Sequence, residues 1–294
     1  MRMVIGEAVS LTVPLLVLAL VVRDRVPRYL FVAIAWGSVA AAAAYLINSA
    51  FLSGAAAYGE LSGARPAYPS GGLGVVPPRL ILAVIEEVIK GFPWFLFGAG
   101  GILGRAGTVF RRLPQFEPGQ WLSWAYAIAT GFAIQETMLV LAHHPGIERP
   151  VAFSVARSLS TGLMHVAATG AFAIVLVSVA RAVTRRCMPV APQAGMLPTG
   201  IALLSAAAGA ALGLVAATLI HFGFNTLVSW QRGLLAESFA VGAFVLTMVA
   251  SRPVASGRAD HRQPLTGDMI ASPPAASPPT GNHPERRSAA RNRD

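Results

Sequence analysis

Hydrophobic residues along the chain gather into long runs that are separated by short polar segments. The runs cover residues 4–22, 29–52, 78–104, 121–142, 151–180, 198–228 and 234–250. A helix that crosses the hydrocarbon core of a bilayer needs about 20 apolar residues, and most of the runs reach that length. They are too long for the strands of a membrane barrel. The pattern therefore predicts an all-α, polytopic transmembrane helical bundle with about seven spans.

Composition favours the same class of protein. Of the 294 residues, 54% are hydrophobic and 12% are charged, and the mean hydropathy is +0.59. A soluble domain carries about 25% charged residues. We therefore expect a multi-pass protein of the cell membrane, with the lipid bilayer as its surroundings.

The arginines indicate an orientation, because they cluster after alternate hydrophobic runs. The clustered set is Arg23, Arg25, Arg28, Arg105, Arg111, Arg112, Arg181, Arg185, Arg186, Arg252, Arg258 and Arg262. Arginine-rich loops face the cytoplasm, so we expect the N-terminus outside and the C-terminus inside. The same assignment places the single cysteine, Cys187, in a cytoplasmic loop. Topology thus accounts for the net charge of +10, and no nucleic-acid partner is expected.

The chain divides into two parts of different composition. Residues 1–250 hold the hydrophobic runs and form the expected transmembrane domain. Residues 251–294 are rich in proline, alanine, serine and arginine and contain almost no large apolar side chains. Such a segment cannot bury a core, so we expect a disordered, basic cytoplasmic tail.

Polar side chains interrupt four successive hydrophobic runs. They are Glu86, Glu87, Lys90, Glu136, Arg157, His165, His221 and Asn225. A charged group at the middle of a spanning helix costs about 2.5–3.5 kcal/mol on the insertion scale. Counted from the expected outer ends of the spans, all eight lie in a band roughly 5–20 Å below the outer surface. This shared depth predicts that they belong to one site.

The segments that carry these residues are similar to the motifs of a known family. EEVIK, FAIQE, a helix with an arginine and then a histidine, and HFGFN follow one another within 78–228. They resemble the PrsW family of intramembrane proteases, which is related to the CAAX-processing and Abi proteases. The resemblance implies a membrane-anchored protein substrate, for example an anti-sigma factor, and a bacterial plasma membrane.

The resemblance also implies roles for individual residues. The catalytic positions are Glu86, Glu87, Glu136, His165, His221 and Asn225. Lys90 and Arg157 are expected to hold the carboxylates in place. The implied activity is hydrolysis of peptide bonds within or near the outer half of the bilayer, by the transmembrane protease domain of residues 1–250.

Two chemical schemes fit this set of side chains. In the first, a buried glutamate activates water, while histidine and asparagine stabilise the oxyanion. In the second, His165, His221 and Glu136 hold a metal, for which zinc is the candidate. The chain has no HExxH pair, the usual mark of a zinc protease, which favours the metal-free scheme.

Other classes of protein remain open at this point. Buried glutamate, lysine and histidine also form proton relays in transporters. A catalytically inactive scaffold that grips a transmembrane partner is a third possibility. The Glu–Lys pair taken alone could be a packing clasp between helices.

Overall fold

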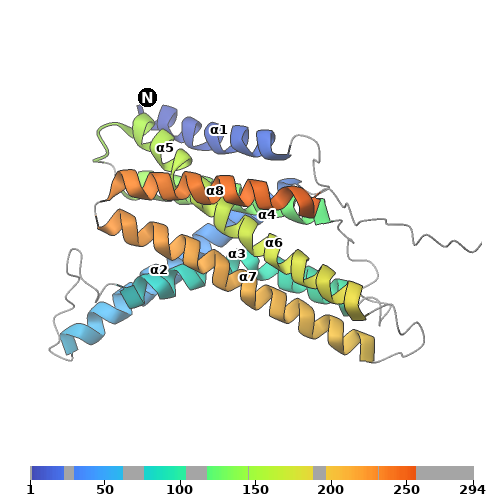
Figure 1. Ribbon diagram of the computed structural model, residues 1–294. Coiled ribbons are helices and arrows are strands. Elements are labelled where there is room, and N and C mark those ends of the chain that lie inside the picture. The colour runs from blue at the N-terminus through green and yellow to red at the C-terminus, as the bar shows by residue number, and fades with distance from the viewer. Residues whose placement is uncertain are drawn as a thin grey trace, which may run out of the picture. The chain divides into compact units, whose positions relative to one another are not determined.

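The computed structural model of the chain describes residues 2–22, 30–61, 76–103, 118–144, 146–187, 197–230 and 232–255. All regular secondary structure in these ranges is helical (Figure 1). The helices are α1 (Arg2–Val22), α2 (Leu30–Leu61), α3 (Val76–Leu103), α4 (Pro118–His143), α5 (Pro150–Leu159), α6 (Thr161–Cys187), α7 (Leu197–Ser229) and α8 (Gly233–Ala255). The predicted all-α class is therefore confirmed.

Five helical segments are long and apolar enough to cross a membrane. They are Leu30–Ser53, Gln120–His143, Pro150–Val179, Leu204–Ser229 and Gly233–Arg252. The apolar part of α1, Val4–Leu20, is shorter, and α3 carries Glu86, Glu87 and Lys90 in the middle of its sequence. The structure thus indicates a multi-pass membrane protein. The count of seven spans and the orientation of the two ends stay predictions.

The run at 151–180 was expected to form one helix, but the structure divides it into α5 and α6. Ser160, between them, has φ −104° and ψ −73°. Its backbone N–H and its hydroxyl both donate to the carbonyl of Ala156, at 2.9 and 2.7 Å. A serine that bonds back to the preceding turn bends a helix. Arg157 and His165 consequently lie on opposite sides of this break.

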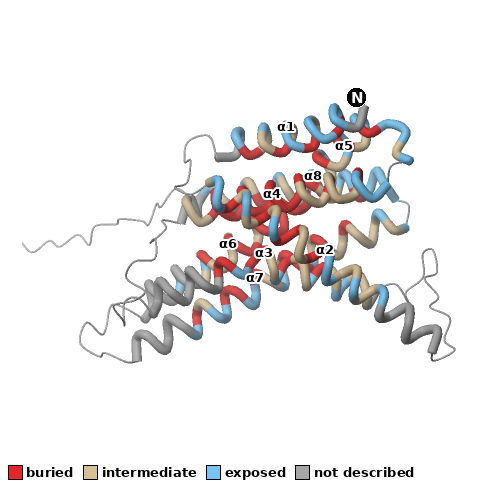
Figure 2. Tube along the Cα trace, turned by 180° about the vertical axis from the view of Figure 1, so that it is seen from behind, coloured by how far each residue is buried: buried red, intermediate tan, exposed pale blue. Residues whose placement is uncertain are grey.

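Helix α4 holds the centre of the described core. Every side chain of residues 122–134 is buried, and α4 packs against α1, α2, α6 and α8 (Figure 2). Aromatic residues of the neighbouring helices, among them Trp94 and Phe172, belong to the same core. Because residues 122–134 of α4 are buried all round, polar groups that face this part of the helix are removed from solvent.

Helices α2 and α4 approach each other until their backbones touch. A Cβ added to Gly37 would lie 2.0 Å from the carbonyl oxygen of Ile128, and one added to Gly131 would lie 2.0 Å from that of Ile34. The Ser38 hydroxyl donates to the carbonyl of Gly131 across this contact, at 3.2 Å. Small residues permit such close crossings of membrane helices. Alanine-rich α2 therefore serves as a packing surface for α4.

Two helices extend further than the hydrophobic pattern predicts. Cys187 was expected in a loop, but helix α6 continues to it, so it is the last residue of this helix. Helix α8 continues to Ala255, past the predicted domain boundary at residue 250. The rest of the predicted tail lies outside the described residues. Helical hydrogen bonding carries both helices beyond the point where hydrophobic residues become sparse.

Candidate functional site

Helix α3 turns two of its charged residues into the core. Its buried positions include Ala83, Glu87, Lys90 and Trp94, a spacing of three and four residues that forms one helical stripe. Lys90 Nζ donates to Glu87 Oε1 within this stripe. Both side chains are fully buried. Each charge therefore has the oppositely charged partner that a buried charge requires.

Lys90 links this pair to helix α6. Its Nζ lies 3.0 Å from His165 Nδ1 and 4.5 Å from the centre of the Phe132 ring. An ammonium group only donates, so His165 Nδ1 must accept and its Nε2 must carry the proton. The tautomer of His165 follows from this contact.

The second nitrogen of His165 continues the chain of contacts to α4 and α5. His165 Nε2 lies 3.0 Å from Glu136 Oε2, and Glu136 Oε1 lies 2.8 Å from Arg157 Nη2. The side chains of Glu136 and Arg157 are 32% and 21% exposed, whereas those of Lys90 and Glu87 are 0% and 2% exposed. The network therefore has a partly open end and a closed interior.

His221 of α7 lies between the two adjacent glutamates of α3. Its Nδ1 is 2.9 Å from Glu87 Oε1, and its Nε2 is 3.4 Å from Glu86 Oε2. The longer contact is not aligned as a hydrogen bond. The ring stands edge-on to that of His165, with centroids 5.0 Å apart at 88°. The two histidines and two glutamates thus surround one small volume.

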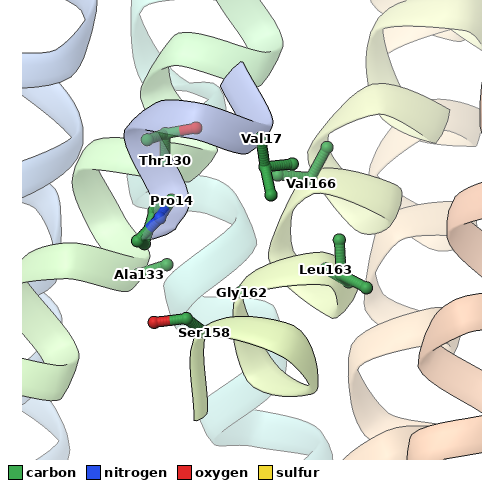
Figure 3. A pocket seen from close by; sticks show the side chains of 8 residues that line it. All are labelled: Pro14, Val17, Thr130, Ala133, Ser158, Gly162, Leu163 and Val166. Carbon is green, nitrogen blue, oxygen red and sulfur yellow. The ribbon is translucent and has the colours of Figure 1, made fainter. Parts of the chain in front are cut away.

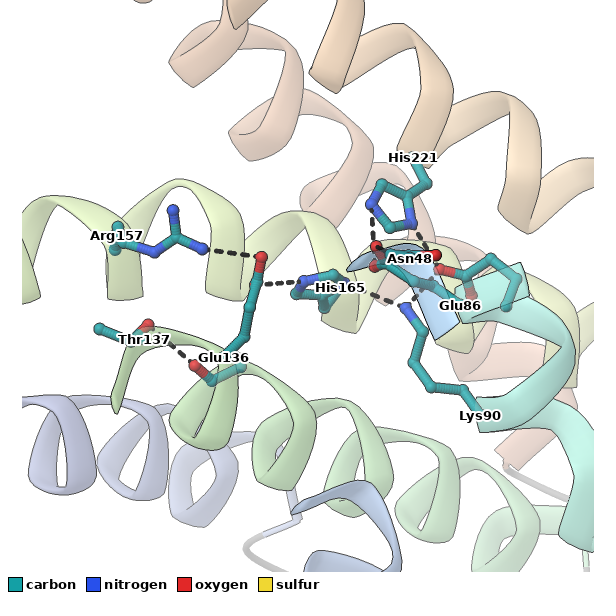
Figure 4. A network of polar contacts seen from close by, with 10 residues as sticks. Asn48, Glu86, Lys90, Glu136, Thr137, Arg157, His165 and His221 are labelled. Carbon is teal, nitrogen blue, oxygen red and sulfur yellow. Dashed lines mark hydrogen bonds and ion pairs between the residues drawn. The ribbon is translucent and has the colours of Figure 1, made fainter. Parts of the chain in front are cut away.

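Asn48 of α2 completes the network. Its Nδ2 donates to Glu86 Oε1 at 3.1 Å. Figure 4 shows the resulting series of contacts from Arg157 at one end to Asn48 and Glu86 at the other. Asn48 was not among the residues predicted from the sequence. The available signal was a lone amide in a long run of alanine and other apolar residues.

The structure brings seven of the eight predicted polar residues into this network: Glu86, Glu87, Lys90, Glu136, Arg157, His165 and His221. Asn225 is half-buried one turn beyond His221 on α7, and its carbonyl accepts the Ser229 hydroxyl at 2.6 Å. Its amide makes no contact with the network in the part of the chain that the structure describes. Helical spacing to His221 alone does not bring an amide to the carboxylates.

The residues that could hold a metal differ in part from the predicted set. Glu86, His165 and His221 each offer one ligand atom, and these atoms lie within 4.8 Å of one another. Glu136 had been expected in this group, but it contacts the far nitrogen of His165 and is paired with Arg157. If His165 held a metal ion, Glu136 would orient its ring from the opposite nitrogen.

The donor types suit zinc, since two histidines and one glutamate form a known catalytic ligand set. One feature works against an ion in this arrangement. His165 Nδ1, the nitrogen that Glu136 leaves free, already faces the Lys90 ammonium at 3.0 Å. A metal ion would compete with Lys90 for this nitrogen.

A small, mostly apolar crevice lies between α1, α4, α5 and α6 (Figure 3). It is lined by Pro14, Val17, Thr130, Ala133, Ser158, Gly162, Leu163 and Val166. The Ser158 hydroxyl is buried and has no hydrogen-bond partner among the described residues. None of the network residues lines the crevice, so it adds no acid–base group to the site.

Comparison with known proteins gives no match: no family model, no curated protein and no solved structure matches the chain. The resemblance to the PrsW family rests on the four motifs alone. Function must therefore be argued from the chemistry of the site.

Proposed function

We propose that the chain is an intramembrane protease that hydrolyses peptide bonds of membrane-anchored proteins. The observation that carries this proposal is the single connected network of three carboxylates, two imidazoles and two cations inside an apolar bundle. Burying this many ionisable groups is costly, and groups placed for acid–base chemistry are a common reason for it. The motif resemblance adds the reaction class, peptide hydrolysis.

The charges of the network leave room for one mobile proton. Glu86, Glu87 and Glu136 supply three negative charges when ionised, while Lys90 and Arg157 supply two positive charges. One further proton makes the set neutral, and the acceptor that we propose for it is Glu86 Oε2, which has no hydrogen bond among the described residues. A group that takes up a proton and later returns it is what general acid–base catalysis needs.

Glu86 is better placed than Glu87 to act as the base. Glu87 Oε1 is held by both Lys90 and His221, whereas Glu86 Oε2 has no aligned hydrogen bond among the described residues. Glu86 Oε2 is buried, and no described residue donates a hydrogen bond to it. This oxygen can therefore accept a proton from a water molecule bound in the site, while Glu87 fixes Lys90 and His221.

The proposed hydrolysis balances as follows. Glu86 Oε2 takes one proton from water as the hydroxyl oxygen attacks the peptide carbonyl carbon. His221 donates a hydrogen bond to the oxyanion. The proton on Glu86 then passes to the leaving amine as the C–N bond breaks. Arg157 and Glu136 orient His165, and Asn225 stays a predicted contributor without an assigned step.

The metal-dependent scheme would use the same residues differently. Glu86, His165 and His221 would hold the ion, and a zinc ion supplies an acidic bound water and polarises the carbonyl. Lys90 would have to leave His165 Nδ1 in that state. We favour the metal-free scheme because the ammonium already occupies the position that faces this nitrogen.

Chelation separates the two schemes. With a metal-free glutamate base, cleavage should continue in the presence of a strong chelator, and elemental analysis of the purified protein should find no stoichiometric zinc. The measurement is the cleavage rate before and after chelation, with and without added zinc. Loss of activity with chelator and its return with zinc would assign the reaction to the metal scheme.

A proton-coupled transporter is the second candidate. The observation that favours it is the unbroken series of titratable contacts from Arg157 to Glu86. Proton uptake into liposomes that contain the protein would support this alternative.

The test of the proposed function is reconstitution. Purified protein is placed in liposomes with a panel of single-span membrane proteins, and the products are analysed by mass spectrometry. We expect cleavage at a defined peptide bond inside or close to the spanning segment of at least one panel member. An intact panel together with proton uptake would replace the protease proposal by the transporter.

A further inference from the structure

Asn48 lies where the close crossing of α2 and α4 leads into the network. The buried positions of α2 include Ala40, Ala41 and Ala44, and Asn48 follows Ala44 by one helical turn. The contact between Gly37 and Gly131 fixes α2 against α4 three turns earlier. This contact fixes the backbone of α2 relative to α4, and with it the position of the Asn48 Cα atom.

The side-chain amide of Asn48 forms a hydrogen bond through its nitrogen but not through its oxygen. Nδ2 donates to Glu86 Oε1 at 3.1 Å. A carboxylate oxygen accepts, so the nitrogen of the amide must face it, which fixes the orientation of the side chain. Oδ1 is buried and has no donor among the described residues.

An unpaired buried acceptor argues against a role in packing alone. Leaving such a group unsatisfied costs about 1–3 kcal/mol. An apolar side chain of similar size would avoid this cost at a position that only packs. What Asn48 contributes is its N–H donor, which faces a carboxylate oxygen of Glu86. Hydrogen bonds to charged groups are stronger than those between neutral groups.

Glu86 is also the carboxylate with the fewest restraints. Glu136 is held by His165 and Arg157, and Glu87 by Lys90 and His221. Apart from the long contact to His221, Glu86 has only the Asn48 donor among the described residues. Without that donor, the carboxylate could leave the orientation that keeps Oε2 beside His221.

We propose that Asn48 is a positioning residue for the reaction, which holds Glu86 Oε1 so that Oε2 stays directed at the reacting water and His221. This inference rests on the proposed protease function. It makes α2 a part of the site, in addition to the motif-bearing helices α3 to α7. Displacement of a catalytic group by about 1 Å can lower turnover roughly 100-fold.

Asn48→Ala tests the proposal, with the fastest-cleaved member of the reconstituted panel as substrate. We expect kcat to fall about 10- to 100-fold while KM changes less than about threefold, because a group is displaced and no substrate contact is removed. Asn48→Asp keeps the shape of the side chain but replaces the N–H donor by a carboxylate oxygen. Its kcat should fall at least as far as that of Asn48→Ala. The matched control is Ser49→Ala, the next residue of α2, which should keep the parent rate.

The specific readout is the combination with Glu86→Gln. If Asn48 acts only through Glu86, adding Asn48→Ala to Glu86→Gln should lower kcat no further. A further 10-fold fall in that background, or an unchanged kcat in Asn48→Ala itself, would overturn the proposal. If Asn48→Ala does not fold, the near-isosteric Asn48→Asp carries the same comparison.

A second measurement separates this inference from the protease function. Melting temperatures of the two single variants and of the double variant form a thermodynamic cycle that needs no activity. Coupling between the two positions supports the contact, and strictly additive shifts contradict it. If the parent protein cleaves no panel member, the proposed protease function is wrong, and so is the positioning role in that reaction. The melting-temperature cycle would still show whether Asn48 and Glu86 interact.

Discussion

Glu86 and Glu87 are neighbours in the sequence, but their surroundings predict different effects of the same substitution. Glu86→Gln keeps shape and removes the basic oxygen, so turnover should fall by roughly 10²–10⁴, the usual contribution of a general base. Glu87→Gln should instead lower the melting temperature, because Lys90 and His221 both lose a charged partner. Cleavage rate and melting temperature, measured side by side for both variants, check this.

Glu237→Gln is the control, since Glu237 is exposed on α8 and lies away from the network residues in the sequence. It should match the parent in both measurements. A Glu86→Gln variant that melts lower and still cleaves at the parent rate would make this glutamate a packing clasp and remove the catalytic interpretation.

Lys90, the only lysine of the chain, should matter for stability as well as activity. Lys90→Met leaves Glu87 in the core without its cation, and breaking a buried ion pair costs about 3–5 kcal/mol. We expect a lower melting temperature and a loss of cleavage. Adding Glu87→Gln to Lys90→Met should recover part of the stability, because it removes the unpaired charge. Failure of the double variant to recover stability would show that the pair does not carry the effect.

Among single residues, the ionisable ones were predictable and the amide was not. The cost of charge in lipid marks Glu86, Lys90 and His165 directly in the sequence. Asn48 carries no charge and lies outside the four motifs, whereas the equally uncharged Asn225 was predicted because it belongs to HFGFN. The expected metal set differs at one of its three positions, Glu136, for a related reason. Depth along a helix places Glu136 and His221 in one layer but does not tell which side of His165 each one occupies.

At the scale of elements, the close crossing of α2 and α4 should control stability. Gly131→Ala places a Cβ 2.0 Å from the carbonyl oxygen of Ile34, so the two backbones must separate. Overpacking of this kind costs about 1–3 kcal/mol. We expect a lower melting temperature and, because α2 carries Asn48, a lower kcat. Thermal unfolding and cleavage assays measure the two effects.

Gly242→Ala of α8 is the matched control, because an added Cβ there meets nothing within 4 Å. Replacing a helical glycine by alanine in open space stabilises a helix slightly. If Gly131→Ala behaved like Gly242→Ala, the crossing would not be as tight as the structure shows.

Helix positions followed well from the hydrophobic pattern, while their internal breaks did not. The run at 151–180 contains no proline that would predict a bend. Ser160 and Gly162 bend the chain through local hydrogen bonding and small size. Apolar periodicity reports burial and length, and it is insensitive to a one-residue kink.

For the molecule as a whole, the orientation in the membrane is the prediction with the widest consequences. The arginine distribution places Cys187, at the end of α6, on the cytoplasmic side. A membrane-impermeant thiol reagent should therefore leave Cys187 unlabelled in intact cells and label it after permeabilisation. A cysteine introduced into the segment 53–77 should show the opposite pattern. Labelling of Cys187 from outside would invert the predicted depth of the whole site.

The burial of three carboxylates beside two cations has a consequence for energetics at the membrane. In the proposed reaction, water delivers one proton to Glu86 and the leaving amine takes one proton away, so each turnover returns the site to the same charge. No elementary charge crosses the bilayer in such a cycle, whereas moving one charge across it costs about 2.3 kcal/mol per 100 mV. Cleavage should thus run at the same rate in energised and de-energised vesicles, independent of transmembrane voltage.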